Sequence, residues 1–147
     1  MQPEITLEAL VKFIKKIQGF EILSHGEIKQ HIAPIISISM YAPGQLILKQ
    51  GDEGKSVFFL YSGHARANVH VNSETTLHND MKEGGIFGEL ALVTNEKRSA
   101  DVVAVSDVCC LSIDIETFQK VMLNNWKITK AIAILIGNRR VKQLPGY

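Results

Sequence analysis

The chain has 147 residues, a length that suits one domain with a complete hydrophobic core. Hydrophobic residues make up 46% of the chain and charged residues 21%, and the formal net charge is +1. This near-neutral balance excludes the basic surface typical of nucleic-acid-binding proteins and the polybasic patches that hold proteins on membranes, so we expect neither kind of partner.

The first 35 residues predict two helices. Residues 6–17 carry apolar side chains at helical spacing, with Thr6 as the N-cap. Lysines interrupt this stretch, so it predicts neither a membrane span nor a secretion signal. Residues 24–33 predict a second helix, in which Ser24 caps the start and Glu27 stands at capping-box spacing.

The middle of the chain predicts short strands separated by turn residues. The expected strands are 36–41, 45–49, 56–61, 64–71, 75–81, 100–104 and 107–113. We expect the fourth and fifth strands to pair across Asn72-Ser73, and the last two across Val105-Ser106. Strands spaced this regularly favour an antiparallel β-roll, or jelly roll.

The two cysteines, Cys109 and Cys110, are adjacent in the last expected strand, where neighbouring side chains point to opposite faces. Directly neighbouring cysteines rarely form a disulfide. We therefore expect buried thiols and a reducing, cytoplasmic location.

Nothing in the strand region predicts catalysis or a metal cofactor. A cupin-type metal site needs two histidines one residue apart, and His64, His70 and His78 do not provide such a pair. His64 and His70 are expected about 20 Å apart on an extended strand, too far to share a metal ion. No serine lies in a nucleophile elbow and no carboxylates form a glycosidase-like pair, so we expect a protein that is not an enzyme.

The end of the chain predicts two more helices, at 116–124 and 126–141, separated by a polar break at Asn124-Asn125. The longer helix has one strongly apolar face. Periodicity alone leaves two interpretations open: a helix packed statically on the roll, or a lid that moves about the polar break.

The most informative stretch of the sequence covers residues 87–92 and is followed by Arg98. Gly88 has no Cβ, so a ligand can lie close to the backbone there, and the apolar residues after it favour a short helix. The first turn of such a helix directs N–H groups at an anion. Arg98 can pair with a phosphate, and Glu89 can accept a hydrogen bond from a sugar hydroxyl.

This stretch resembles the phosphate-binding cassette of cyclic-nucleotide-binding domains. The resemblance lies in the sequence Phe-Gly-Glu-Leu-Ala-Leu and in an Arg-x-Ala that begins nine residues after the glutamate. That family includes regulatory subunits of cAMP-dependent kinase, cGMP-dependent kinase, nucleotide-gated channels and bacterial catabolite activators. The resemblance implies that Glu89 holds the ribose 2′-hydroxyl and Arg98 the phosphate. The implied ligand-binding residues are Gly88, Glu89, Leu90, Ala91, Arg98, Ser99 and Ala100.

The resemblance also implies a fold that is mainly β with flanking helices. One domain would cover residues 1–147, with helices in 1–35, a β-roll in 36–113 and hinge and lid helices in 114–147. The cassette would occupy residues 84–101. The resemblance favours the lid interpretation of the last helix, with Ile132, Leu135 or Ile136 as the contact to the base.

Two positions bear on the ligand. In the family, threonine directly after the arginine accompanies cGMP binding and alanine accompanies cAMP binding, while serine occurs in bacterial cAMP binders. Ser99 therefore favours cAMP and leaves cGMP open. Asp101 would repel the phosphate if its carboxylate faced the ligand, but strand alternation also allows it to point away.

The implied function is allosteric. A bound cyclic nucleotide would move the lid and so regulate an effector domain or subunit outside this chain, such as part of a channel, kinase or transporter. The alternative is a degenerate domain that keeps the fold as a protein-interaction module and binds no nucleotide. In that case Arg98 and Glu89 would be a structural ion pair.

Overall fold

A computed structural model describes residues 4–94 and 96–143, the last five by their backbone alone. Asn95, inside the predicted cassette, and the two ends of the predicted domain, 1–3 and 144–147, lie outside the described residues. The chain forms two compact units, a β-unit of residues 37–115 and a helical unit of residues 4–36 with 116–143. That one domain covers the whole chain stays a prediction.

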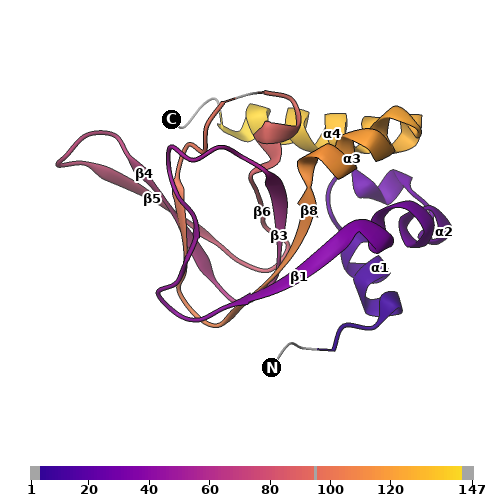
Figure 1. The fold of residues 1–147 in the computed structure, drawn as a ribbon, viewed down its shortest axis with the longest axis horizontal. Helices are drawn as coiled ribbons and strands as arrows, with labels where there is room; N and C mark the ends of the chain where they lie inside the picture. The colour runs from indigo at the N-terminus through magenta and orange to yellow at the C-terminus, as the bar shows by residue number, and fades with distance from the viewer. Residues whose placement is uncertain (1–3, 95, 144–147) are drawn as a thin grey trace. The chain divides into compact units, whose positions relative to one another are not determined.

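The helical unit holds the predicted helices at both ends of the chain (Figure 1). The caps at the N-terminal end lie where the sequence predicts them. Thr6 Oγ1 accepts a hydrogen bond from the N–H of Ala9 at 3.1 Å, and Ser24 and Glu27 form both bonds of a capping box. The elements are α1 (Leu7–Lys15), η1 (Phe20–Ile22), α2 (His25–Glu27), η2 (Ile28–Ile32), η3 (Ala33–Ile35), α3 (Ile115–Leu123) and α4 (Trp126–Gln143).

The second predicted helix is irregular. Its first turn, α2, is followed by the π-helical turn η2 and the 3₁₀ turn η3 instead of one continuous α-helix. Pro34 lies near the start of η3. Because proline has no backbone N–H and its ring collides with the carbonyl four residues earlier, an α-helix cannot continue through it.

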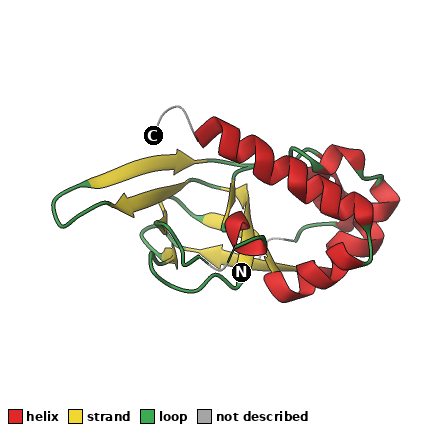
Figure 2. Cartoon of the chain, turned by 90° about the horizontal axis from the view of Figure 1, so that it is seen from above, coloured by secondary structure: helices red, strands yellow, loops and turns green. Residues whose placement is uncertain are grey.

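The longest helix, α4, is the long red coil in Figure 2. It packs closely against the chain just before η1. Gly19 has a φ of +99°, and a Cβ at this position would collide with the backbone carbonyl oxygen of Ala131. Asn125 lies in the predicted polar break and caps α4, since its side-chain oxygen accepts hydrogen bonds from the N–H groups of Lys127 and Ile128. Among the described residues, no helix is long and apolar enough to span a membrane.

The β-unit consists of two four-stranded sheets, the arrangement expected of a β-roll. One sheet has the strand order β1-β8-β3-β6 and the other β2-β7-β4-β5. The β4–β5 hairpin extends beyond the other strands in Figure 1, and its register confirms the predicted pairing across Asn72-Ser73. The strands are β1 (Ile36–Tyr41), β2 (Leu46–Leu48), β3 (Ser56–Ser62), β4 (Ala65–His70), β5 (Thr76–Met81), β6 (Ile86–Phe87), β7 (Asp101–Ala104) and β8 (Val108–Asp114).

The predicted pairing of the last two strands is wrong. β7 pairs with β2 and β4, whereas β8 pairs with β3 in the other sheet. The short connection through Val105 and Ser106 does not close a hairpin, because both N–H groups bond to the carbonyl of His64 and the chain crosses from one sheet to the other. Strand β6, only two residues long, is also absent from the prediction.

Apolar side chains from both sheets fill the space between them. In this cluster, the rings of Phe58 and Phe87 stack with their centroids 5.1 Å apart. Burial, with a further contribution from the adjacent Cys109, raises the pKa of the Cys110 thiol to about 12, so this thiol is unreactive. Both cysteines are free and buried, as predicted. The cluster comprises Phe58, Leu60, Ala65, Phe87, Val102, Ala104, Val108 and Cys110.

Candidate functional site

The predicted cassette helix is present as a single 3₁₀ turn, η4 (Glu89–Leu92), directly after β6. Gly88 precedes it with a φ of +82°, a conformation that costs an L-residue free energy. Gly88 also lacks room for a side chain, since a Cβ there would collide with Nη1 of Arg98 and lie 3.0 Å from the carbonyl oxygen of Ser56. The glycine therefore sets both the start of the turn and the space for the arginine.

Arg98 lies on the loop between η4 and β7, and its side chain returns to the cassette. Its Nη2 donates to the carbonyl oxygen of Ser56 at 2.6 Å, and its Nη1 donates to that of Gly88 at 3.2 Å. Its Cζ lies 6.0 Å from the centre of the Phe58 ring. These contacts place a guanidinium beside the first turn of η4, which is the arrangement that the cassette motif predicts.

Two residues that complete this setting are absent from the predicted site. The backbone carbonyl of Ser56 accepts a hydrogen bond from Arg98. Because every residue has a backbone carbonyl, no sequence pattern could predict this contact. Gly54 lies against the guanidinium, and a Cβ there would be 3.1 Å from Cζ of Arg98 and 2.8 Å from Cβ of Ala91. The glycine spacing of residues 50–54 is the sequence signal that could have identified it.

Among the described residues, the buried charged side chains are Glu89 and Arg98, which are 5% and 9% exposed. Burial lowers the pKa of the Arg98 guanidinium, and the negative charge of Glu89 acts in the opposite direction. Arginine stays charged despite such shifts. Two opposite charges therefore lie within one largely desolvated site, where each interacts more strongly with a charged or polar ligand than it would in water.

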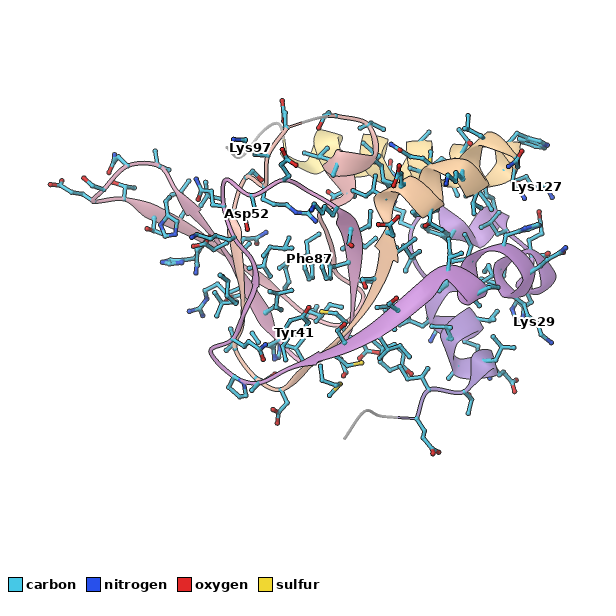
Figure 3. The ribbon with its side chains drawn as sticks, viewed as in Figure 1. Lys29, Tyr41, Asp52, Phe87, Lys97 and Lys127 are labelled. Carbon is cyan, nitrogen blue, oxygen red and sulfur yellow. The ribbon has the colours of Figure 1, made fainter. Side chains whose placement is uncertain are left out.

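The remaining predicted cassette residues lie around this pair. Leu90 and Ala91 are half-buried in η4, where the N–H of Ala91 bonds at 3.4 Å to the carbonyl of Gly88. Ser99 is exposed and Ala100 is half-buried, and both follow Arg98 toward β7. Figure 3 shows Phe87 inside the β-unit and Asp52 and Lys97 on the loops at one of its edges. The predicted cassette thus forms one local structure, while the contacts of its members with a ligand stay a prediction.

Asp101 points away from the apolar cluster. Its neighbours Val102 and Ala104 are buried in that cluster, so alternation along β7 places the Asp101 side chain at the start of the strand on the other face. There it accepts hydrogen bonds from the N–H of Gln50 at 2.7 Å and from the His70 ring at 2.8 Å. These bonds lower the pKa of the carboxyl, the Gln50 bond most strongly. Its carboxylate is thus engaged by Gln50 and His70, while its orientation toward a bound phosphate stays a prediction.

The three predicted lid residues are buried in α4. Ile132 is 1% exposed, Leu135 3% and Ile136 9%. Within the helical unit, the turn at Gly19 lies close to α4, since a Cβ there would be 3.2 Å from the backbone nitrogen of Leu135. In this arrangement α4 is held by close backbone packing, and the contact of these side chains with a base stays a prediction.

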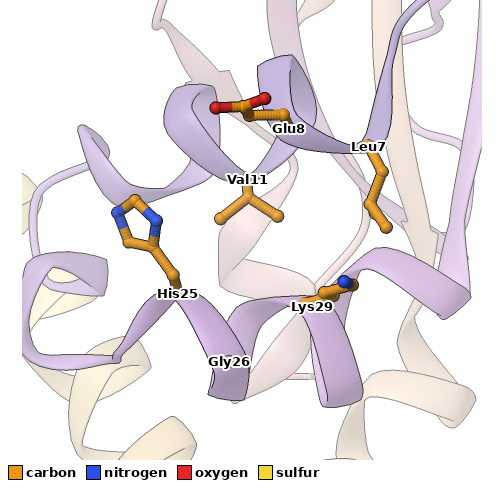
Figure 4. A pocket seen from close by; sticks show the side chains of 6 residues that line it. All are labelled: Leu7, Glu8, Val11, His25, Gly26 and Lys29. Atoms are coloured by element: carbon orange, nitrogen blue, oxygen red, sulfur yellow. The ribbon is translucent and has the colours of Figure 1, made fainter.

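A separate pocket of about 410 Å³ lies within the helical unit, between α1 and α2 (Figure 4). It is lined by Leu7, Glu8, Val11, His25, Gly26 and Lys29, none of which belongs to the predicted site. Within the part of the chain that the structure describes, no group of three or more histidine, cysteine, aspartate or glutamate side chains could hold a metal ion.

Comparisons with known proteins find matches in sequence and in fold. The sequence model of the family described as "Cyclic nucleotide-binding domain" matches residues 39–125. The chain is 34% identical over 110 residues to a cAMP-dependent protein kinase regulatory subunit of Colletotrichum orbiculare, covering 75% of this chain and 27% of that protein. It is 31% identical over 120 residues to cGMP-dependent protein kinase, isozyme 1, of Drosophila melanogaster, covering 79% of this chain and 16% of that protein.

Solved structures share the fold. The regulatory domain of Toxoplasma gondii PKA, crystallised with cAMP, superposes with a TM-score of 0.78 at 20% identity, covering 92% of this chain and 50% of that one. The catabolite activator protein of Thermus thermophilus superposes with a TM-score of 0.75 at 25% identity, covering 84% and 58%. The chain spans about a quarter or less of the length of the curated relatives named above.

Proposed function

The chain belongs to the cyclic nucleotide-binding domain family, and we propose that it binds a cyclic nucleotide, with Arg98 at the phosphate and Glu89 at the ribose. The observation that carries this proposal is the burial of these two opposite charges, of which Glu89 begins η4 and Arg98 donates to the carbonyl of Gly88 directly before it. A charged group in a largely desolvated site interacts more strongly with a charged or polar ligand than it would in water. A ligand that presents one phosphate charge and one hydroxyl would use both groups.

The geometry of Arg98 suits a phosphate. A guanidinium has five N–H donors in one plane, so the two bonds to the carbonyls of Ser56 and Gly88 orient it without using its full capacity. The first turn of a helix can present backbone N–H groups to an anion, and Leu90 and Ala91 of η4 would take this role. The N–H of Ala91 would then exchange its 3.4 Å bond to the carbonyl of Gly88 for a bond to the phosphate. With Gly88 and Ala100 these residues would form the cradle around the phosphate, and Ser99 would also contact the ligand.

We favour cAMP over cGMP as the ligand, on the basis of Ser99. The relatives named above include kinases of both kinds, so the family does not decide the base. The ligand would act alone, without a metal or another cofactor.

We propose that the chain regulates an effector and does not catalyse a reaction. Nucleotide binding would shift α4 about the break at Asn124-Asn125, with Ile132, Leu135 or Ile136 meeting the base. Because these side chains are buried in the present arrangement, the free energy of ligand binding would have to offset the loss of that packing. The effector would be a kinase, channel or transporter component outside this chain, in the cytoplasm.

The proposal is tested by calorimetric titration of the Arg98→Ala variant with cAMP and cGMP. Removing the partner of a desolvated phosphate is expected to weaken binding by about 2–5 kcal/mol. Arg98→Lys, which keeps the charge but loses the planar donor array, should lose less. The matched control is Arg66→Ala, because Arg66 is an exposed arginine of the same unit that pairs with Asp80. Equal affinities for the wild type and Arg98→Ala would refute the role of Arg98.

A further inference from the structure

The loop between β2 and β3, residues 49–55, holds Arg98 from two directions. The N–H of Arg98 donates to the carbonyl of Asp52 at 2.7 Å, and the N–H of Gly51 donates to the carbonyl of Arg98 at 2.9 Å. Gly54 lies against the guanidinium of the same arginine. The position of Arg98 therefore follows the position of this loop.

The loop is itself attached to the neighbouring sheet through Gln50. Its side chain bridges the backbone of His70, accepting from the N–H at 2.9 Å and donating to the carbonyl at 3.2 Å. Its backbone N–H donates to Oδ1 of Asp101 at 2.7 Å. Three hydrogen bonds thus connect the loop to the end of β4 and the start of β7.

The ring of His70 completes the attachment. Its Nε2 lies 2.8 Å from Oδ2 of Asp101, and its Nδ1 lies 3.1 Å from Oγ1 of Thr76 on β5. A neutral ring with its hydrogen on Nε2 donates to the carboxylate and accepts from the threonine hydroxyl. A protonated ring keeps the first bond and adds a positive charge to it, which makes the bond shorter and stronger. The side chains of His70 and Asp101 are 49% and 24% exposed, so solvent protons reach them.

We infer that His70 and Asp101 are positioning residues that hold the 49–55 loop, and through it Arg98, in the arrangement that binds nucleotide. The attachment is stronger when His70 is protonated. The inference rests on the proposed function, because it assigns a pH dependence to that same site. Histidine changes charge between about pH 5 and 8. Nucleotide affinity is therefore higher when the His70 ring is protonated than when it is neutral.

The acidic group that faces His70 is Asp101, which sets this sign. The positive charge of Lys49 at the start of the loop also acts on the Asp101 carboxyl. Thr76 is neutral. The next titratable ring along the hairpin, His78, bonds to Asn68 at 2.6 Å and forms none of the bonds to the loop.

The test measures affinity for cAMP and cGMP by calorimetry from pH 5.5 to 8.5 at constant ionic strength, a range in which the cyclic phosphate keeps its single charge. We expect the wild-type affinity to fall by roughly two- to fivefold across this range, the size that a partly exposed ion pair supplies. His70→Gln keeps a side chain that can bond to Asp101 but cannot gain charge, so its affinity should not change with pH. Asp101→Asn should behave likewise, and His78→Gln should keep the wild-type pH dependence.

A wild-type affinity that does not change with pH, or a pH dependence that persists in His70→Gln, would overturn the inference. If the wild type binds neither nucleotide, the proposed function fails by itself, and hydrogen exchange then decides the inference without ligand. Protection factors of the Gly51 and Arg98 amides should fall from pH 6 to pH 8 in the wild type and should be low at both pH values in Asp101→Asn. Equal protection in the wild type and Asp101→Asn would refute the attachment.

Discussion

A methyl group added at Gly54 should weaken nucleotide binding, because this position has no room for one. The Cβ of alanine would lie 2.8 Å from Cβ of Ala91 and 3.1 Å from Cζ of Arg98. Carbon atoms in good contact lie about 3.5–4.0 Å apart, so the neighbours must move by roughly half an ångström. The first neighbour belongs to the cassette turn η4, and the second is held by its bonds to two carbonyls.

Overpacking of this kind costs about 1–3 kcal/mol. If this free energy destabilises only the conformation that binds the ligand, the affinity for the ligand decreases by roughly 5- to 150-fold. We expect Gly54→Ala to reduce the affinity for cAMP at least about tenfold in a calorimetric titration, within that range.

The control is Gly26→Ala in the helical unit, where the nearest atom to the new Cβ is Ser24 Oγ at 3.9 Å. That variant should bind normally and gain up to about 1 kcal/mol in stability, since alanine favours helix over glycine. Wild-type affinity in a folded Gly54→Ala protein would refute the proposed position of Arg98 at the ligand.

Three further predictions concern the ribose contact, the helical unit and acid stability. Glu89→Gln should weaken nucleotide binding less than Arg98→Ala does, and it should reduce the preference for cAMP over 2′-deoxy-cAMP. An equal loss of affinity for both nucleotides would contradict a contact between Glu89 and the ribose. Gly19→Ala should lower the free energy of unfolding, measured in urea, by about 2 kcal/mol or more, because the new Cβ collides with its neighbours and strains the backbone. Gly44→Ala should lower it less, because the space around its Cβ is open. Because the folded state lowers the pKa of Asp101 from its ordinary 3.8, this carboxylate stabilises the fold above about pH 4 and loses that contribution as the pH falls further. The stability difference between wild type and Asp101→Asn, followed by urea unfolding from pH 7 to pH 2.5, should therefore shrink at the acid end, and a constant difference would contradict the assignment.

Features set by neighbouring residues could be predicted from the sequence. The capping box at Ser24, the hairpin across Asn72-Ser73 and the polar break before Trp126 each depend on residues a few positions apart. The cassette turn at Gly88 belongs to this class, because a glycine followed by helix-forming residues encodes it locally.

Features set by contacts between distant segments could not be predicted in the same way. The sheet to which β7 belongs depends on its pairing with β2 and β4, which no local turn signal encodes. The bonds of Asp101 to Gln50 and His70 join positions 51 and 31 residues apart in the chain. Alternation along β7 allowed two orientations of Asp101, and only the packing of Val102 into the core selects one.

Whether this chain binds a cyclic nucleotide can be measured by calorimetric titration of the wild-type chain with cAMP, cGMP and 5′-AMP, after removal of any nucleotide that co-purifies. We expect saturable binding at one site for a cyclic nucleotide, with cAMP bound more tightly than cGMP and the linear nucleotide bound weakly. No saturable heat with either cyclic nucleotide would contradict it and would indicate that Arg98 and Glu89 are kept as a structural pair in a domain used for its contacts with other proteins.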